Sequence, residues 1–266
     1  MRSQKQLRTI GVLGGMGPEA TLLFMQRVLA AVDVRDDADH IPLLVDQNPQ
    51  VPSRIAALIE KKDPDPAPVL KQMAMRLEDA GAAALVMPCN TAHAYAAAIQ
   101  DAVSIPFLSM MDITAAVIAG KTPRACVGIL ASPAVKLTGV FEAPLSERGL
   151  TPIYSDNQDQ LLSAIKRLKC NGTDPNARKT VLAGARTLHS AGADIILIGC
   201  SEFSLLGRDI ERIAPAIDSL DALVAATVSY SQSGEPGFGR SSKPAHRPGA
   251  DTPENQTGPL PREAAV

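Results

Sequence analysis

Two cysteines, Cys89 and Cys200, occupy equivalent positions in an internal repeat. The stretch Ala80-Gly-Ala-Ala-Ala-Leu-Val-Met-Pro-Cys89 matches Ala191-Gly-Ala-Asp-Ile-Ile-Leu-Ile-Gly-Cys200 without a gap. In each copy a short apolar run after the glycine predicts a buried strand, and the cysteine comes where that strand ends. Two related halves that face each other would bring two thiols to one cleft from opposite sides. That arrangement suits the transfer of a proton across a carbon centre.

Polar residues follow both cysteines directly: Asn90 and Thr91 in one copy, Ser201 and Glu202 in the other. A helix beginning just after each cysteine would favour thiolate over thiol, because its free N–H groups carry partial positive charge. The same N–H groups could hold a carboxylate, and the polar side chains add donors. One site could therefore bind an anionic substrate and present a base to it. A disulfide between the two cysteines is the alternative, but it leaves the polar residues without a role.

The other two cysteines, Cys126 and Cys170, are expected to be inert, because a free cysteine usually packs as a small hydrophobic residue. The chain has no C-x-x-C pair and only four histidines, so we expect no metal site.

The composition excludes several classes of partner. Aromatic residues make up 3% of the 266 residues, tryptophan is absent and the net charge is −2. These values argue against binding to nucleic acid or to an anionic membrane surface. No apolar run is long enough to span a bilayer, and the run at residues 10–13 is too short for a signal peptide. We therefore expect a cytoplasmic protein with reduced thiols.

Apolar runs alternate with helix-like segments, which predicts parallel sheets with right-handed crossovers. Further strands are expected near residues 9–13, 41–45, 125–130 and 152–154, with helices near 19–28, 55–58, 69–79, 91–103, 160–168 and 180–190. We predict an α/β fold of two pseudo-symmetric lobes, 7–112 and 113–218, each a mostly parallel sheet flanked by helices, with the active site between them. A closing helix is expected at 219–232. Residues 233–266 are rich in proline and glycine, which is typical of a disordered tail.

A glycine-rich turn at residues 14–17 follows the first expected strand. Its spacing, G-x-x-G-G-x-G, differs from the G-x-G-x-x-G of dinucleotide-binding folds, so nucleotide binding is not expected. A tight turn that brings Met16 and Gly17 beside a substrate fits better. Arg54 follows a loop with two prolines and could bind a carboxylate through two parallel hydrogen bonds. An arginine in such a place is otherwise usually just solvated.

Four segments together resemble the aspartate/glutamate racemase family, whose members work without pyridoxal phosphate. Pro88-Cys-Asn-Thr-Ala-His93 and Gly199-Cys-Ser-Glu202 are similar to its two cysteine motifs. Gly11-Val-Leu-Gly-Gly-Met-Gly-Pro-Glu-Ala20 and Asn48-Pro-Gln-Val-Pro-Ser-Arg54 resemble two further family segments. The resemblance covers residues 9–230 and leaves out the tail.

The resemblance implies racemisation of a dicarboxylic amino acid, aspartate or glutamate, with Cys89 and Cys200 as the two catalytic bases and with no cofactor. It also implies a set of substrate-binding residues: Met16, Gly17, Asn48, Arg54, Asn90, Thr91, Ala92, Lys169 and Ser201. The family pattern includes a lysine late in the second lobe, and Lys166 is the alternative to Lys169 for that position. His93 and Glu202 are expected to contact the catalytic residues and not the substrate itself. A homodimer is expected, as is common in the family.

Two positions depart from the family pattern: Ser201, where threonine is commoner, and Ser53, where an acidic residue often precedes the arginine. Both could alter selectivity for the substrate's side chain. Two other functions stay open. A related two-cysteine isomerase or decarboxylase, acting on maleate or hydantoins, would share the fold and the thiols. A dicarboxylate-binding protein without catalysis would keep the pocket but would need neither thiol.

Overall fold

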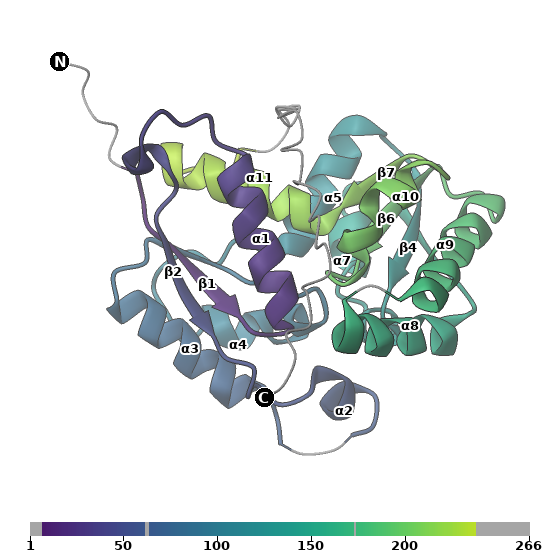
Figure 1. Ribbon diagram of the computed structural model, residues 1–266, viewed down its shortest axis with the longest axis horizontal. Helices are drawn as coiled ribbons and strands as arrows, with labels where there is room; N and C mark the ends of the chain where they lie inside the picture. Colours follow the sequence, from purple (N-terminus) through teal and green to yellow (C-terminus); the bar gives the residue numbers. More distant parts are fainter. Residues whose placement is uncertain (1–6, 62–63, 173, 238–266) are drawn as a thin grey trace, which may run out of the picture.

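The computed structural model describes residues 7–61, 64–172 and 174–237. It contains two parallel sheets with helices packed on their faces (Figure 1), as the sequence predicted. The first sheet has the order β2-β1-β3, and the second has the order β5-β4-β6-β7. The strands are β1 (Ile10–Gly14), β2 (Leu43–Gln47), β3 (Ala84–Val86), β4 (Cys126–Ala131), β5 (Thr151–Tyr154), β6 (Ile195–Gly199) and β7 (Ala216–Asp218).

The helices follow the strands in alternation, as parallel pairing requires. In the first half they are α1 (Pro18–Ala30), α2 (Arg54–Leu58), α3 (Ala67–Asp79), α4 (Ala96–Gln100) and α5 (Met110–Lys121). In the second half they are α6 (Pro133–Thr138), α7 (Glu142–Ser146), α8 (Gln158–Asn171), α9 (Pro175–Ser190), α10 (Gly207–Glu211) and α11 (Ser219–Ser233). Short 3₁₀ turns are η1 (Asp37–Asp39), η2 (Thr91–Tyr95) and η3 (Phe203–Leu206). Within the described residues, no helix is both long and apolar enough to cross a membrane.

The internal repeat is visible in the packing around one glycine of each central strand. A Cβ atom at Gly11 would come within about 3 Å of side chains of Leu77, Ala82 and Leu85. A Cβ atom at Gly128 would meet Leu188, Ala193 and Ile196 equally closely. The three residues that face Gly128 each lie 111 positions after the corresponding residue that faces Gly11. The two halves therefore pack a helix against a sheet in the same way.

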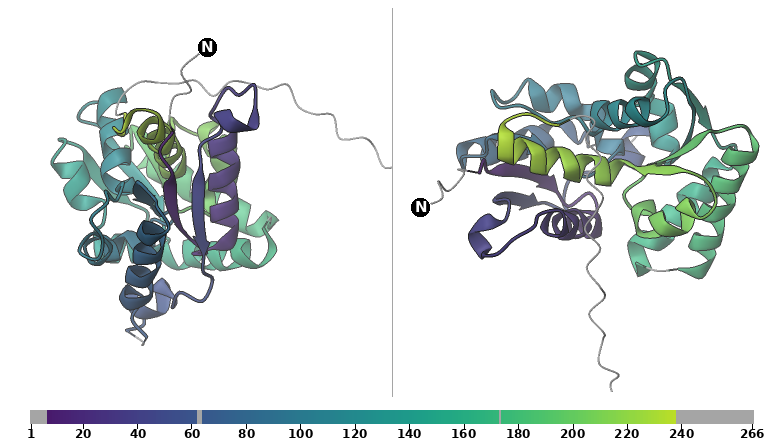
Figure 2. Two further views of the ribbon diagram at one scale, coloured as in Figure 1. Left: turned by 90° about the vertical axis from the view of Figure 1, so that its left-hand side faces the viewer. Right: turned by 90° about the horizontal axis from the view of Figure 1, so that it is seen from above.

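The helix α11 is the counterpart of α5. Each begins just after the last parallel pairing of its half, which is an isolated bridge between Leu85 and Phe107 in the first half and β7 in the second. The two helices pack against each other and α11 also contacts α1, so that α11 extends across both halves (Figures 1 and 2). The expected lobe boundary between residues 112 and 113 falls inside α5. We therefore propose that each half includes its own member of this helix pair.

Three apolar clusters form the core. One joins the halves and contains residues of β1, β4, α5 and α11, such as Val12, Ile129, Ile118 and Leu223. Each half also has an outer cluster, and Cys89 belongs to one of these and Cys200 to the other. The expected disordered tail, residues 233–266, lies outside the described residues from residue 238 onward.

The segments that follow the two strands before the cysteines differ from the expected pattern. The strand β6 ends at Gly199, directly before Cys200, but β3 ends at Val86. Pro88 has no N–H to give to a strand ladder, and the Cys89 N–H instead donates to the Met87 carbonyl. The helix expected at 91–103 is a 3₁₀ turn, η2, followed by the short α4. The second cysteine is likewise followed by a 3₁₀ turn, η3.

Candidate active site

Both cysteines lie buried near the carboxyl ends of strands that belong to different sheets. Cys89 is 8% exposed and Cys200 is 6% exposed. All four cysteines are free thiols, so the structure has no disulfide between Cys89 and Cys200. Each thiol stands at the edge where parallel α/β sheets bind their ligands.

The thiol of Cys200 takes part in a chain of polar contacts. Its Sγ donates a hydrogen bond to Oε2 of Glu202 at 3.0 Å, and Oε1 of Glu202 lies 2.6 Å from Nζ of Lys169. Burial, together with the negative charge of Glu202 and its hydrogen bond, raises the pKa of Cys200 well above its ordinary value. Lys169 opposes this rise without cancelling it. Cys200 is therefore a protonated thiol at neutral pH.

This result corrects one expectation from the sequence. A helix beginning after each cysteine was expected to favour thiolate, but the turn η3 is a 3₁₀ turn of four residues that begins only at Phe203. A turn that short carries little dipole. The apolar surroundings and Glu202 dominate at Cys200 instead.

Lys169 reaches the site from α8 and lies close to the glycine turn of the first half. Burial lowers its pKa, but Glu202 and then the thiols of Cys89 and Cys200 raise it, and the net shift is upward. A Cβ atom on Gly17 would lie 3.7 Å from Nζ of Lys169, so the glycine turn of the first half passes close to this ammonium. Lys169 lines the cavity, whereas its rival Lys166, on the same helix, is not among the lining residues. The geometry favours Lys169 for the lysine of the site.

The turn after Cys89 carries three of the expected residues, and one of them, Thr91, contacts the second half. The Asn90 side chain is 2% exposed, and neither atom of its amide has a hydrogen-bond partner in the described part of the chain. Such a group is suited to bind a ligand, because an unpaired buried amide is costly. Thr91 Oγ1 lies 3.0 Å from Oγ of Ser132, which follows β4. Ala92 is fully buried and contributes no side-chain polar atom.

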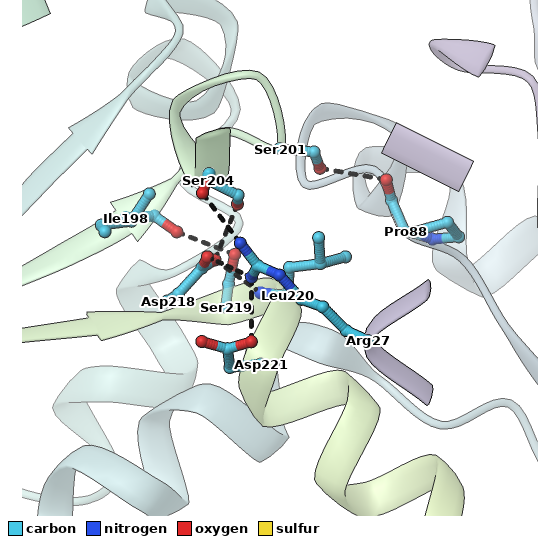
Figure 3. A network of polar contacts seen from close by, with 9 residues as sticks. All are labelled: Arg27, Pro88, Ile198, Ser201, Ser204, Asp218, Ser219, Leu220 and Asp221. Carbon is cyan, nitrogen blue, oxygen red and sulfur yellow. Dashed lines mark hydrogen bonds and ion pairs between the residues drawn. The ribbon is translucent and has the colours of Figure 1, made fainter. Parts of the chain in front are cut away.

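Ser201 joins the halves a second time. Its Oγ donates to the carbonyl oxygen of Pro88 at 3.0 Å (Figure 3). The residue after one cysteine is thus bonded to the residue before the other, which holds the two cysteine segments together.

His93 is hydrogen-bonded to the backbone of Cys89. Its Nε2 accepts from the Met110 N–H at 3.2 Å, so Nδ1 carries the proton and donates to the Cys89 carbonyl at 2.9 Å. Burial lowers the pKa of His93 to about 4, which keeps the ring neutral. The ring also packs at 5.4 Å against the ring of Phe107. This is a positioning arrangement, with no free nitrogen left for a substrate.

A cavity of about 200 Å³ opens beside these contacts. It is smaller than the ~300–1,000 Å³ of pockets for drug-sized ligands and suits a small polar molecule. Its walls come from the glycine turn and α1, from the loop before α2, from Lys169 and from the segment after Cys200. The lining residues are Gly15, Gly17, Pro18, Glu19, Ala20, Leu23, Pro49, Arg54, Lys169, Ser201, Glu202 and Leu205.

Arg54 is the first residue of α2, whose N-cap is Ser53. Its Nη1 donates to the carbonyls of Val51 at 3.0 Å and Pro52 at 2.8 Å. These bonds hold the guanidinium at the cavity wall by one nitrogen. Within the described residues its Nε and Nη2 groups have no hydrogen-bond partner and can serve a carboxylate in the cavity.

Met16 and Asn48 lie behind the cavity wall. Met16 is 4% exposed and packs in the outer apolar cluster of the first half. The Asn48 Oδ1 accepts from the Gln50 N–H at 2.9 Å, and Gly15, with φ +89°, lies so close to the Asn48 backbone that a Cβ atom would clash. Both residues shape the glycine turn.

Several wall residues were not singled out from the sequence. Glu19, Leu23 and Leu205 line the cavity, and Ser132 pairs with Thr91. For Ser132 a signal existed, because it is a polar residue directly after the central strand β4, while Glu19 lies in the first turn of α1, the helix that follows the central strand β1.

Comparisons with known proteins show the family to which this fold belongs. A model of the family described as Asp/Glu/hydantoin racemase matches residues 13–227. The chain is 29% identical over 231 residues to the broad specificity amino-acid racemase RacX of Bacillus subtilis, covering 83% of this chain and 96% of that protein. It is 25% identical over 162 residues to the glutamate racemase of Aquifex aeolicus, covering 60% of this chain and 61% of that protein.

The solved structure of Picrophilus torridus aspartate racemase superimposes with a TM-score of 0.76 at 29% identity, covering 86% of this chain and 95% of that one. The fold and these matches define an isomerase of the racemase type. The chain belongs to the Asp/Glu/hydantoin racemase family.

Proposed function

We propose that this racemase interconverts the enantiomers of a dicarboxylic amino acid, aspartate or glutamate, with Cys89 and Cys200 as a pair of acid and base groups and without pyridoxal phosphate. One observation carries the proposal: Ser201, directly after Cys200, donates to the carbonyl of Pro88, directly before Cys89, at 3.0 Å, so two buried thiols from different halves of the fold lie in bonded segments. Two thiols that come together from different sheets can serve the two faces of one carbon atom.

The protonation of Cys200 assigns roles for one direction of the reaction. Its thiol is protonated at neutral pH and can act as the acid, while Cys89 as thiolate removes the α-proton from the opposite face. The electron pair left on the α-carbon takes the proton of the Cys200 S–H. After this step Cys89 is a thiol and Cys200 is a thiolate.

The reverse direction starts from the form that this step leaves, with Cys200 as thiolate and Cys89 as thiol. Before that step Oε2 of Glu202 accepts the hydrogen bond of the Cys200 thiol at 3.0 Å and so stabilises its protonated form. Lys169 holds the other oxygen of that carboxylate at 2.6 Å and also stabilises a thiolate nearby. Glu202 and Lys169 thereby set the protonation state of Cys200.

The cavity and the turn after Cys89 offer separate groups for the charges of a dicarboxylic amino acid. Arg54, in the cavity wall, can take the side-chain carboxylate with its Nε and Nη2 groups. Ser201 also lines the cavity, whereas Asn90 and Thr91 lie outside its lining, and we assign these three residues to the α-carboxylate and the α-ammonium. The small volume of the cavity fits such a substrate.

The relatives support an amino-acid substrate and leave its side chain open. They are named as a broad specificity amino-acid racemase, glutamate racemases and an aspartate racemase. The family description also includes hydantoin racemase, which is the second candidate. A homodimer and a cytoplasmic location remain our predictions from the sequence.

A racemisation assay without added cofactor tests the proposal. Purified protein is incubated with L- and D-enantiomers of a panel that includes aspartate, glutamate, neutral and basic amino acids and a 5-substituted hydantoin. We expect racemisation of aspartate or glutamate, with deuterium from D₂O entering the α-position. Turnover of the hydantoin alone would select the second candidate. Binding of aspartate and glutamate without any deuterium exchange would identify a binding protein and refute the proposal.

A further inference from the structure

A group of polar contacts outside the cavity joins α1 of the first half to the segment after Cys200 (Figure 3). Arg27 donates from Nη2 to the Ser204 carbonyl at 2.8 Å and from Nη1 to Asp218 Oδ2 at 2.6 Å. The other carboxylate oxygen, Oδ1, accepts from the Ser204 hydroxyl at 2.8 Å. Arg27, Ser204 and Asp218 thus form a closed circuit of hydrogen bonds, which we call the Arg27 ring.

The ring is largely withdrawn from water. The Asp218 side chain is 6% exposed, that of Arg27 is 23% exposed, and Ser204 is buried. Asp221 also accepts from Arg27 Nη1, at 2.9 Å, but its side chain is 63% exposed. An exposed ion pair contributes little, whereas breaking a buried one leaves an uncompensated charge. Arg27 therefore has one strong and one weak carboxylate partner.

The ring acts on the segment that carries the Cys200 thiol. Ser204 is held by its carbonyl and by its hydroxyl, and Ser201 in the same segment is bonded to Pro88 at 3.0 Å. On the other side of Cys200, the Ser219 hydroxyl donates to the Ile198 carbonyl at 2.8 Å. The segment is thus bonded to the first half through Arg27 and through the residue before Cys89.

We propose that the Arg27 ring positions the Cys200 thiol against Cys89, which makes Arg27, Ser204 and Asp218 positioning residues for proton transfer. This inference rests on the proposed two-thiol function. A thiol displaced by about 1 Å transfers a proton on the order of a hundredfold more slowly, even when the substrate is still bound. Among the described residues, the hydrogen bonds of the ring involve none of the charged groups that line the cavity, so we expect its loss to affect turnover more than substrate binding.

The test compares Arg27→Lys, Asp218→Asn and Ser204→Ala with the control Asp221→Asn, which removes only the exposed partner. Lysine keeps the charge at position 27 but cannot reach Ser204 and Asp218 together. We expect kcat to fall about tenfold or more in the ring variants, with KM within about twofold of the parent value. Asp221→Asn is expected to match the parent protein in both. Ser204→Ala removes one hydroxyl and serves if the charge variants fail to fold.

A second measurement needs no substrate. The rate at which iodoacetamide alkylates Cys200 in the folded protein is followed by peptide mass spectrometry, with Cys126 as the internal reference. We expect faster alkylation of Cys200 relative to Cys126 in the ring variants and no change in Asp221→Asn. If the parent protein is inactive on aspartate and glutamate, the proposed function is refuted. The ratio of Cys200 to Cys126 alkylation would still test whether the Arg27 ring positions Cys200. Variants with lowered thermal midpoints but parental kcat and parental alkylation would show a purely structural role and overturn the inference.

Discussion

The Cys200 thiol donates a hydrogen bond to the carboxylate of Glu202, two residues further along the chain, at 3.0 Å. The contact places a proton acceptor beside a thiol whose pKa is raised by burial and by that same negative charge. The protonation state of one proposed catalytic group is therefore controlled from within its own segment.

Replacing Glu202 should lower the pKa of Cys200. In Glu202→Gln the negative charge is gone and Lys169 loses its partner, so the thiolate is disfavoured by burial alone. The pH profile of Cys200 alkylation by iodoacetamide is expected to shift to lower pH. Glu19→Gln is the matched control, because Glu19 lines the same cavity without contacting Cys200. An unshifted profile in Glu202→Gln would remove Glu202 from the control of this thiol.

Acid should destabilise the protein through His93. The pKa of this buried ring is lowered from 6.5 to about 4, so the folded state binds fewer protons than the unfolded state between these values. The stability is complete above pH 6.5 and is lost as the pH falls towards 4. The loss amounts to at most about 3 kcal/mol for this group.

Urea unfolding between pH 7.5 and 4.5 measures this dependence. His93→Gln removes the titrating ring, so its free energy of unfolding should vary less with pH than that of the parent protein. Parallel curves for the two proteins would contradict the assignment.

The repeat itself explains how much of the fold could be predicted. Gly11 and Gly128, with the leucines and alanines that pack on them, are local signals, and they correctly gave two related α/β halves. The early end of β3 depends on Pro88 and could have been anticipated from its missing N–H. The pairing of α5 with α11 could not, because the apolar residues of both helices are spread around the helix instead of forming one distinct face that would indicate a partner.

The candidate site could be predicted where its residues directly follow a strand in the sequence. It could not be predicted where it depends on contacts between residues far apart in the sequence. Asn90, Thr91, Ser201 and Glu202 come directly after the predicted strands. The contact of Lys169 with Glu202 depends on how α8 packs beside η3, and that of Arg27 with Asp218 joins residues 191 positions apart. No local pattern encodes either contact.

Arg54 should contribute mainly to binding of the substrate's side-chain carboxylate. Arg54→Ala is expected to reduce kcat/KM for aspartate or glutamate by about 2–5 kcal/mol, because a charged hydrogen-bonding partner is lost. Arg54→Lys should restore little, since an ammonium lacks the planar fork. Arg76→Ala is the control, because Arg76 pairs with Asp46 on the surface, where its side chain is 55% exposed. Near-parental kcat/KM in Arg54→Ala would place Arg54 outside the binding site.

The two-thiol mechanism makes the sharpest prediction. Cys89→Ala and Cys200→Ala should each abolish racemisation, because every turnover needs a base on one face and an acid on the other. The double variant should be little worse than either single one, since the pair works as a unit. Cys126→Ala and Cys170→Ala, which change the two remaining thiols, should keep parental activity.

Each single variant keeps one thiol, which can remove and return a proton on its own face of the α-carbon. In D₂O, Cys89→Ala and Cys200→Ala should therefore exchange the α-proton of opposite enantiomers, as measured by proton NMR of L- and D-substrate. The physical reason is that Cys89 and Cys200 pack in the clusters of different halves, so that in the proposed mechanism they meet the substrate from opposite sides. Exchange of the same enantiomer by both variants would mean that the thiols share one face, and the mechanism would have to be abandoned.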